Sequence, residues 1–87
     1  MERDESLEKA KRLIDRGNTY YDHRKYNKAE KRYKRALEIL KKRFGDKHPY
    51  IAKVLIYLGL VYYRQGKYSN TRDVVKQALE IYKKTIW

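Results

Sequence analysis

Apolar side chains recur along the chain at intervals of three and four residues, the period of one face of an α-helix. One such stripe runs through Leu13, Ile14 and Tyr20, and another through Val54, Leu55, Leu58 and Tyr62. Each stripe lapses and then resumes at the same spacing. The pattern predicts helices near residues 5–22, 26–43, 48–64 and 68–85.

The residues between these stretches are ones that end or begin helices. Gly66 lies in RQGKY, where it can take the left-handed conformation that closes a helix. In FGDKHPY, residues 44–50, Gly45 is expected to stop one helix. Pro49 is expected in the first turn of the next helix, where a missing N–H is tolerated best.

The chain repeats itself at a spacing of 42 residues. Residues 10–42 align with 52–84, and 16 of these 33 pairs are identical, so RGNTYYDHRKY at 16–26 returns as LGLVYYRQGKY at 58–68. Similarity at a fixed period predicts one supersecondary unit used twice. Gly17 and Gly59 are expected to let the second helix of each unit approach the first, with Ala29, Ala36 and Ala78 small on the other side.

Composition points to a small helical domain with a strong positive charge. The 87 residues are 41% hydrophobic and 39% charged, and 23 Lys and Arg against 11 Asp and Glu give a net charge of +12. Such an excess attracts acidic partners. The longest uncharged run, VLIYLGLVYY, is too short to span a bilayer, and the N-terminal residues do not form a secretory signal. We therefore expect a cytoplasmic protein.

Residue types that carry catalysis or bind metals are scarce. The sequence has no cysteine and two histidines, His23 and His48, neither with a second ligand three or four residues away. We expect His48 to hydrogen-bond backbone in the turn and His23 to be solvated. Four glutamates precede a Lys or Arg by four residues, which favours surface ion pairs over paired carboxylates: Glu8, Glu30, Glu38 and Glu80. We expect no enzymatic activity, cofactor or metal.

The small and aromatic residues at these positions resemble those of tetratricopeptide repeats, over about residues 8–86. The period of 42, ALEI at 36–39 and the Gly-Asp-x-His-Pro turn are similar to kinesin light chain repeats. Arg16, Arg24 and Thr71 depart from the family's Leu, Gly and Ala positions. The resemblance implies an all-α fold of two stacked helix-turn-helix repeats, four antiparallel helices in a right-handed superhelical array. Repeat one would span about 5–47 and repeat two about 48–87.

In this family the first helices of the repeats line a concave groove that receives a peptide or a partner helix. By that resemblance, Ile14, Asp15, Asp22 and Ile56 would face the groove together with the candidate binding residues Lys11, Asn18, Tyr21, Lys53, Tyr57, Leu60, Tyr63 and Arg64. Kinesin light chain repeats accept acidic peptides bearing a Trp, and a basic groove would suit such a protein or peptide partner. Ordinary helix packing for the tyrosines and solvated charge for the lysines are the alternatives.

The C-terminal helix carries apolar residues where a third repeat would pack. Leu79, Tyr82, Ile86 and Trp87 would form an apolar patch, and such patches usually mark a partner surface. A longer repeat array, or a homo-oligomer formed through this helix, would cover it. An engineered repeat protein without a natural ligand is a further alternative.

Among the binding functions, nucleic-acid binding is less favoured than protein binding. Residues 23–43 interleave Tyr with Lys and Arg, as base stacking plus phosphate contact would require. However, Tyr26 and Tyr33 occupy packing positions of the repeat and are expected in the core. We therefore expect a protein-binding module or scaffold, no membrane association, and no specific nucleic-acid site.

Overall fold

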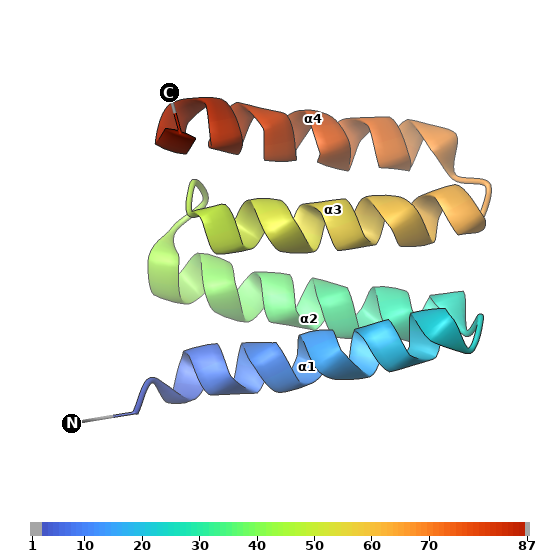
Figure 1. Cartoon of the computed structure of the whole chain (residues 1–87), viewed down its shortest axis with the longest axis horizontal. Helices are drawn as coiled ribbons and strands as arrows, with labels where there is room; N and C mark the ends of the chain where they lie inside the picture. The colour runs from blue at the N-terminus through green and yellow to red at the C-terminus, as the bar shows by residue number, and fades with distance from the viewer. Residues whose placement is uncertain (1–2, 87) are drawn as a thin grey trace.

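The computed structural model describes residues 3–86, with side chains up to Thr85. In these residues the chain forms four helices and no strand: α1 (Glu5–Asp22), α2 (Tyr26–Phe44), α3 (Pro49–Arg64) and α4 (Tyr68–Ile86). Each predicted helix is present, with boundaries within about one residue. Figure 1 shows the helices running antiparallel in chain order. This confirms the predicted all-α fold of two stacked helix-turn-helix repeats, here called repeat one (α1 and α2) and repeat two (α3 and α4).

Helix ends follow from the residues that the sequence places there. Asp4 caps α1, where its carboxylate accepts from the Leu7 N–H at 3.1 Å. The His48 ring caps α3 by accepting from the Tyr50 N–H at 3.1 Å, directly before Pro49. The expected backbone contact of His48 is thus confirmed. Gly45 follows α2 and Gly66 precedes α4, both with positive φ.

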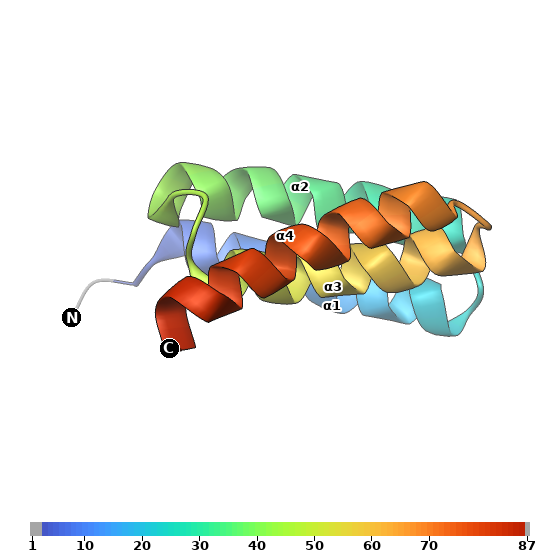
Figure 2. The same cartoon turned by 90° about the horizontal axis from the view of Figure 1, so that it is seen from above.

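Packing is sequential, so each helix lies against its neighbours in the chain. The helices of each repeat pack as an antiparallel pair, and the pairs meet where α2 contacts α3. Figure 2 shows α4 crossing over α3 on the outer side of the stack. Consequently α3 has helices on two sides, and α4 is the outermost helix of repeat two.

The core runs between the two repeats and is richest on α3. Eight residues of α3 are buried, compared with two residues of α1. The alanines predicted at close contacts, Ala29, Ala36 and Ala78, are all buried. The other buried apolar residues are Ala10, Tyr33, Leu40, Ile51, Ala52, Val54, Leu55, Leu58, Val61, Tyr62 and Ile81.

Of the four ion pairs predicted for glutamates, one is present with the expected partner. Glu30 pairs with Lys34 as expected, at 2.7 Å. Glu8 instead contacts Arg3 at 2.8 Å, and Glu38 contacts Arg35 at 3.2 Å. Among the described residues, Glu80 has no ion pair within 4 Å. An exposed carboxylate can form ion pairs of similar energy with several neighbouring cations, so sequence spacing alone does not determine its partner.

Candidate functional site

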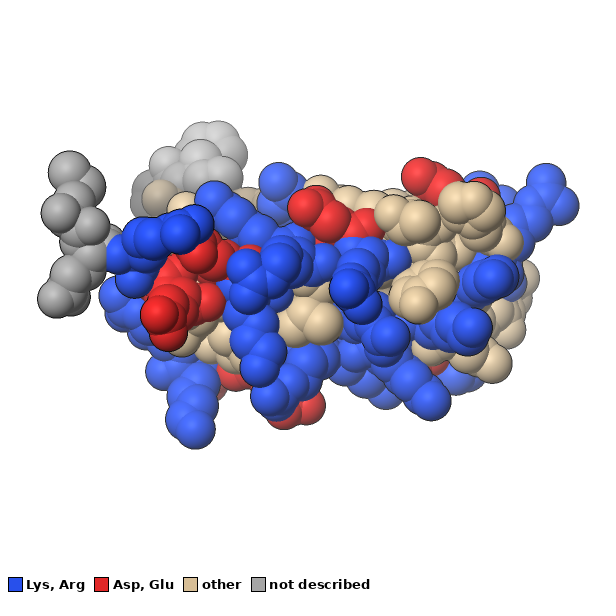
Figure 3. All heavy atoms as spheres, turned by 90° about the horizontal axis from the view of Figure 1, so that it is seen from below, with Lys and Arg blue, Asp and Glu red and all other residues tan. Residues whose placement is uncertain are grey.

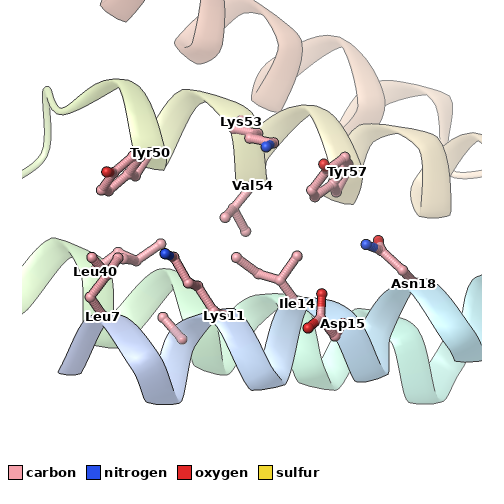
Figure 4. Close-up of a pocket in the computed structure, with 11 residues that line it drawn as sticks. Leu7, Lys11, Ile14, Asp15, Asn18, Leu40, Tyr50, Lys53, Val54 and Tyr57 are labelled. Carbon is pink, nitrogen blue, oxygen red and sulfur yellow. The ribbon is translucent and has the colours of Figure 1, made fainter. Parts of the chain in front are cut away.

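A cleft of about 260 Å³ separates α1 from α3. Figure 4 shows the side chains of the two helices facing one another across it. Its floor is apolar, because Leu7, Ile14, Leu40 and Val54 line it. The other lining residues are Ala10, Lys11, Asp15, Asn18, Tyr50, Lys53 and Tyr57. We call this the α1–α3 cleft.

Two lysines at equivalent repeat positions border the cleft from opposite helices. Lys11 lies on α1, and Lys53, 42 residues later, lies on α3. Both are exposed, and both lie near the middle of the cleft in Figure 4. Asp15 is the one acidic side chain among the lining residues. The middle of the cleft therefore presents two cations to any ligand that rests on the apolar floor.

Asn18 is held in place by an aromatic pair at one end of the cleft. The Tyr33 hydroxyl donates a short hydrogen bond to Oδ1 of Asn18, and the Tyr33 ring stacks on Tyr57 at 5.5 Å between centroids. Burial above all, with the nearby Tyr57 and Asp22, raises the pKa of the Tyr33 hydroxyl far above its ordinary value. The hydroxyl stays protonated and keeps donating. The amide nitrogen of Asn18 can therefore donate to a ligand while its oxygen accepts from Tyr33.

Half of the eight candidate binding residues lie at this cleft: Lys11, Asn18, Lys53 and Tyr57. The other four lie elsewhere. Arg64 donates to the Tyr21 hydroxyl at 3.1 Å and stacks over that ring, joining the C-terminal ends of α1 and α3. Leu60 and Tyr63 are exposed on α3, outside the residues that line the cleft.

Several lining residues were not among the candidates. Leu40 projects from α2 between the two first helices, which helical periodicity within α1 and α3 cannot indicate. Tyr50 lies in the first turn of α3 and packs edge-on against Phe44 at 5.5 Å. The position of Tyr50 could have been predicted from the His-Pro turn before it, since that turn determines where α3 begins.

The predicted self-association residues are described only in part. Leu79 is exposed, whereas Tyr82 is half-buried and packs against the core. The side chain of Ile86 and the whole of Trp87 lie outside the described residues. Self-association through this helix stays a prediction.

The surface is strongly basic, but three of the tyrosines close to its Lys and Arg side chains are engaged in packing. Figure 3 shows Lys and Arg over much of the face seen from below, with smaller groups of Asp and Glu. Tyr33 is buried and Tyr26 half-buried, as expected. Tyr20, half-buried on α1, lies under Lys28 and Arg32 at 5.7 and 5.4 Å. These three rings are not free to stack on bases.

Other chemistry is sparse in the part of the chain that the structure describes. His23 is exposed, and its Nδ1 lies 2.8 Å from the Thr19 carbonyl oxygen. Within residues 3–86 no group of three or more His, Asp or Glu side chains could hold a metal ion. None of the described helices is long and apolar enough to cross a membrane.

Comparison with protein families agrees with the fold. Residues 4–84 match the tetratricopeptide repeat family. The chain belongs to this family, whose members are typically non-enzymatic modules for protein–protein interaction. The closer likeness to kinesin light chains and an engineered origin stay predictions. No curated protein matches the chain.

Proposed function

We propose that the protein binds an extended acidic segment of a partner protein in the α1–α3 cleft. The carrying observation is that Lys11 and Lys53 border one cleft from opposite helices, above an apolar floor. Opposite charge around an apolar contact surface favours both fast association and specific register. The binding energy would come from the apolar contact and the specificity from the lysines.

The order of side chains along the cleft suggests how such a segment would lie. Leu7, Leu40 and Tyr50 lie at one end, the two lysines near the middle, and Asp15 with Asn18 at the other end in Figure 4. An apolar or aromatic side chain suits the first end, and a carboxylate suits the middle. Backbone N–H groups of the peptide suit Asp15. The volume is below the roughly 300 Å³ of a typical small-molecule pocket, so one or two side chains would fill it.

The test measures affinity for synthetic peptides by fluorescence anisotropy. One set of decapeptides carries four acidic residues and one Trp, and a matched set carries Lys in place of the acidic residues. We expect the chain to bind the acidic set, and Lys11→Gln with Lys53→Gln to weaken binding by about tenfold or more. The control, Lys31→Gln with Lys84→Gln, removes the same charge from exposed positions outside the cleft.

Two results would overturn the proposal. Equal weakening in the cleft variant and the control would mean that net charge alone attracts the peptides. If circular dichroism shows the chain to be folded and it binds no acidic peptide, acidic peptides are not its ligands. A single-stranded oligonucleotide of the same charge serves as a further control. Tighter binding of the oligonucleotide, falling steeply with salt, would favour nucleic acid instead.

A further inference from the structure

Five of the exposed apolar side chains of repeat two lie on two adjacent helices at helical spacing. Ile56, Leu60 and Tyr63 on α3 are 38, 49 and 57% exposed, and Val75 and Leu79 on α4 are 36 and 57% exposed. Each set follows the three-and-four spacing of one helix face. We call these five residues the end face. In residues 3–86 no helix covers it, and in Figure 1 α4 is the last helix of the stack.

Repeat one shows what this kind of surface binds. A shift of 42 residues maps the end face onto Ile14, Asn18, Tyr21, Tyr33 and Leu37. There, α3 contacts two of these positions: Tyr33 is 2% exposed and stacks on Tyr57, and the Tyr21 hydroxyl accepts from Arg64, while Ile14 and Asn18 line the α1–α3 cleft. The end face therefore occupies the repeat-two positions of a surface that, in repeat one, packs partly against a helix.

The charge at one position beside this surface is reversed between the repeats, whereas Lys76 and Lys83 repeat Lys34 and Lys41. In repeat one, Glu30 accepts from Nε2 of Gln65 at 3.0 Å and lies 3.6 Å from Nζ of Lys67, both from repeat two. The equivalent residue beside the end face is Arg72. Lys76 and Lys83 follow it on the same face of α4, and all three are exposed. A helix bound here would need acidic groups near its C-terminal end, because repeat two presents Gln65 and Lys67 directly after α3.

The first helix of a second copy, packed head to tail on the end face, does not meet this requirement. The α3 residues that are buried on the inner side of the helix include Ile51, Val54, Leu58 and Val61. Their equivalents on α1 are Lys9, Arg12, Arg16 and Thr19, all exposed. Packing α1 of another copy on the end face would bury three cations beside Arg72 and its neighbours. Burying unpaired like charges is strongly unfavourable.

We propose that the end face binds an amphipathic helix with acidic flanks from a partner protein, seated as α3 is seated on repeat one. The site is separate from the α1–α3 cleft, since none of its five residues lines that cleft. Apolar contact with Leu60 and Leu79 would provide most of the affinity. Arg72 and Lys76 would select the acidic helix, because mismatched charges at the edge of an interface disfavour the wrong partner.

The experiment compares two synthetic helices of 16 residues, the length of α3. Both carry the same Leu and Ile stripe at three-and-four spacing, one with Glu on its flanks and one with Lys. We expect calorimetry to show the Glu helix binding about tenfold tighter or more, and Arg72→Glu with Lys76→Glu to remove that preference. Leu60→Ser with Leu79→Ser should weaken binding of the Glu helix at least as much.

Two control variants keep the interpretation specific. Lys31→Glu with Lys84→Glu makes the same charge change outside the end face and should alter the affinity by less than about twofold. Lys11→Gln, which lies in the cleft on α1 and away from the end face, should leave helix binding unchanged, so that failure here and failure of the cleft proposal are distinguishable. Equal affinity for both helices, no binding of either, or loss of binding in either control would overturn the proposal.

Self-association would overturn it in a different way. Light scattering over a concentration series would reveal dimers of the parent chain. If those dimers dissociate in the Leu60→Ser, Leu79→Ser variant, the end face binds a second copy rather than an acidic helix. A parent chain that stays monomeric while binding the Glu helix is the expected result.

Discussion

Repeat one and repeat two carry many of the same residues in different surroundings. Leu13 and Leu55 are equivalent, as are Tyr20 and Tyr62, yet only the second member of each pair is buried. The cause is position in the stack, since α3 contacts both α2 and α4 while one side of α1 faces solvent. A helix with neighbours on two sides buries a wider face than a helix at the end.

The outer surface of repeat one is polar, whereas that of repeat two is apolar. The outward side of α1 is polar, with Lys9, Arg12 and Arg16 exposed where α3 buries Ile51, Val54 and Leu58. Repeat two instead exposes the apolar end face. Among the described residues, the outward side of α1 is polar and that of α4 is apolar, which is why a partner helix is proposed only at repeat two.

Substitution of the glycines in α1 and α3 should give the largest difference in stability between the two repeats. A Cβ at Gly17 would lie 2.6 Å from Cε1 of Tyr33, whose ring is fixed by Tyr57 and Asn18. A Cβ at Gly59 would lie 3.2 Å from Cγ2 of Val75, which borders solvent and can shift. We expect Gly17→Ala to lower the free energy of unfolding by about 1–3 kcal/mol. Gly59→Ala should change it by less than about 1 kcal/mol, because gained helix propensity offsets the contact.

Urea unfolding followed by circular dichroism checks both variants. The double variant Gly17→Ala, Tyr33→Leu is the control, since a flexible side chain in place of the ring should recover part of the loss. Equal destabilisation at the two glycines would show that the Tyr33 contact does not distinguish the repeats.

The two inter-helix turns give the second comparison. Arg24 and Gly66 have φ of 61° and 77°, and the residues after them, Lys25 and Lys67, both donate to a Tyr carbonyl at 2.8 Å. The two repeats therefore have the same turn, with Arg24 in repeat one where repeat two has Gly66. Left-handed backbone costs a non-glycine residue about 1–2 kcal/mol. Arg24→Gly should stabilise the protein by about 0.5 kcal/mol and Gly66→Ala destabilise it by about 1 kcal/mol, since glycine also loses more backbone entropy on folding.

Thermal unfolding of the two turn variants measures these changes. Arg24→Ala separates backbone strain from loss of the arginine side chain, and it should leave the stability near that of the parent. Destabilisation by Arg24→Gly would mean that the charged side chain matters more than the backbone conformation.

The smallest expected difference between the repeats is at Glu30, whose equivalent in repeat two is Arg72. Burial by itself would raise the pKa of Glu30, but hydrogen bonds from Lys34 and Gln65 and the charges of Lys34 and Lys67 lower it below the ordinary 4.5. A carboxylate with a lowered folded-state pKa contributes stability above its unfolded pKa. That contribution is lost as the pH falls through the folded value.

We therefore expect Glu30→Gln to cost about 0.5 kcal/mol at pH 7, with the difference from the parent shrinking as the pH falls below 4.5. Urea unfolding at a series of pH values measures this. Glu80→Gln, on repeat two, is the control, because in the described residues Glu80 has no ion pair. A difference that grows on acidification would contradict the assigned direction of the pKa shift.

Part of the candidate cleft could be anticipated from the sequence. Lys11 and Lys53 are related by the repeat, and helical spacing places Asn18 on the same face as Lys11. The contribution of Leu40 could not be anticipated in the same way, because it depends on how α2 passes between the two first helices. The Tyr33–Asn18 hydrogen bond likewise joins two helices, and its geometry follows from their close approach at Gly17.

The sequence by itself determined the four helices, their ends and the repeat. These depend on interactions between residues near one another in the chain, namely apolar periodicity, caps and turn residues. Tertiary structure decided which copy of each repeated residue is buried and which residues share the cleft. It also decided that the end face lacks a covering helix in the described residues. Burial depends on the neighbours of a whole helix, and equivalent positions in α1 and α3 have different neighbours.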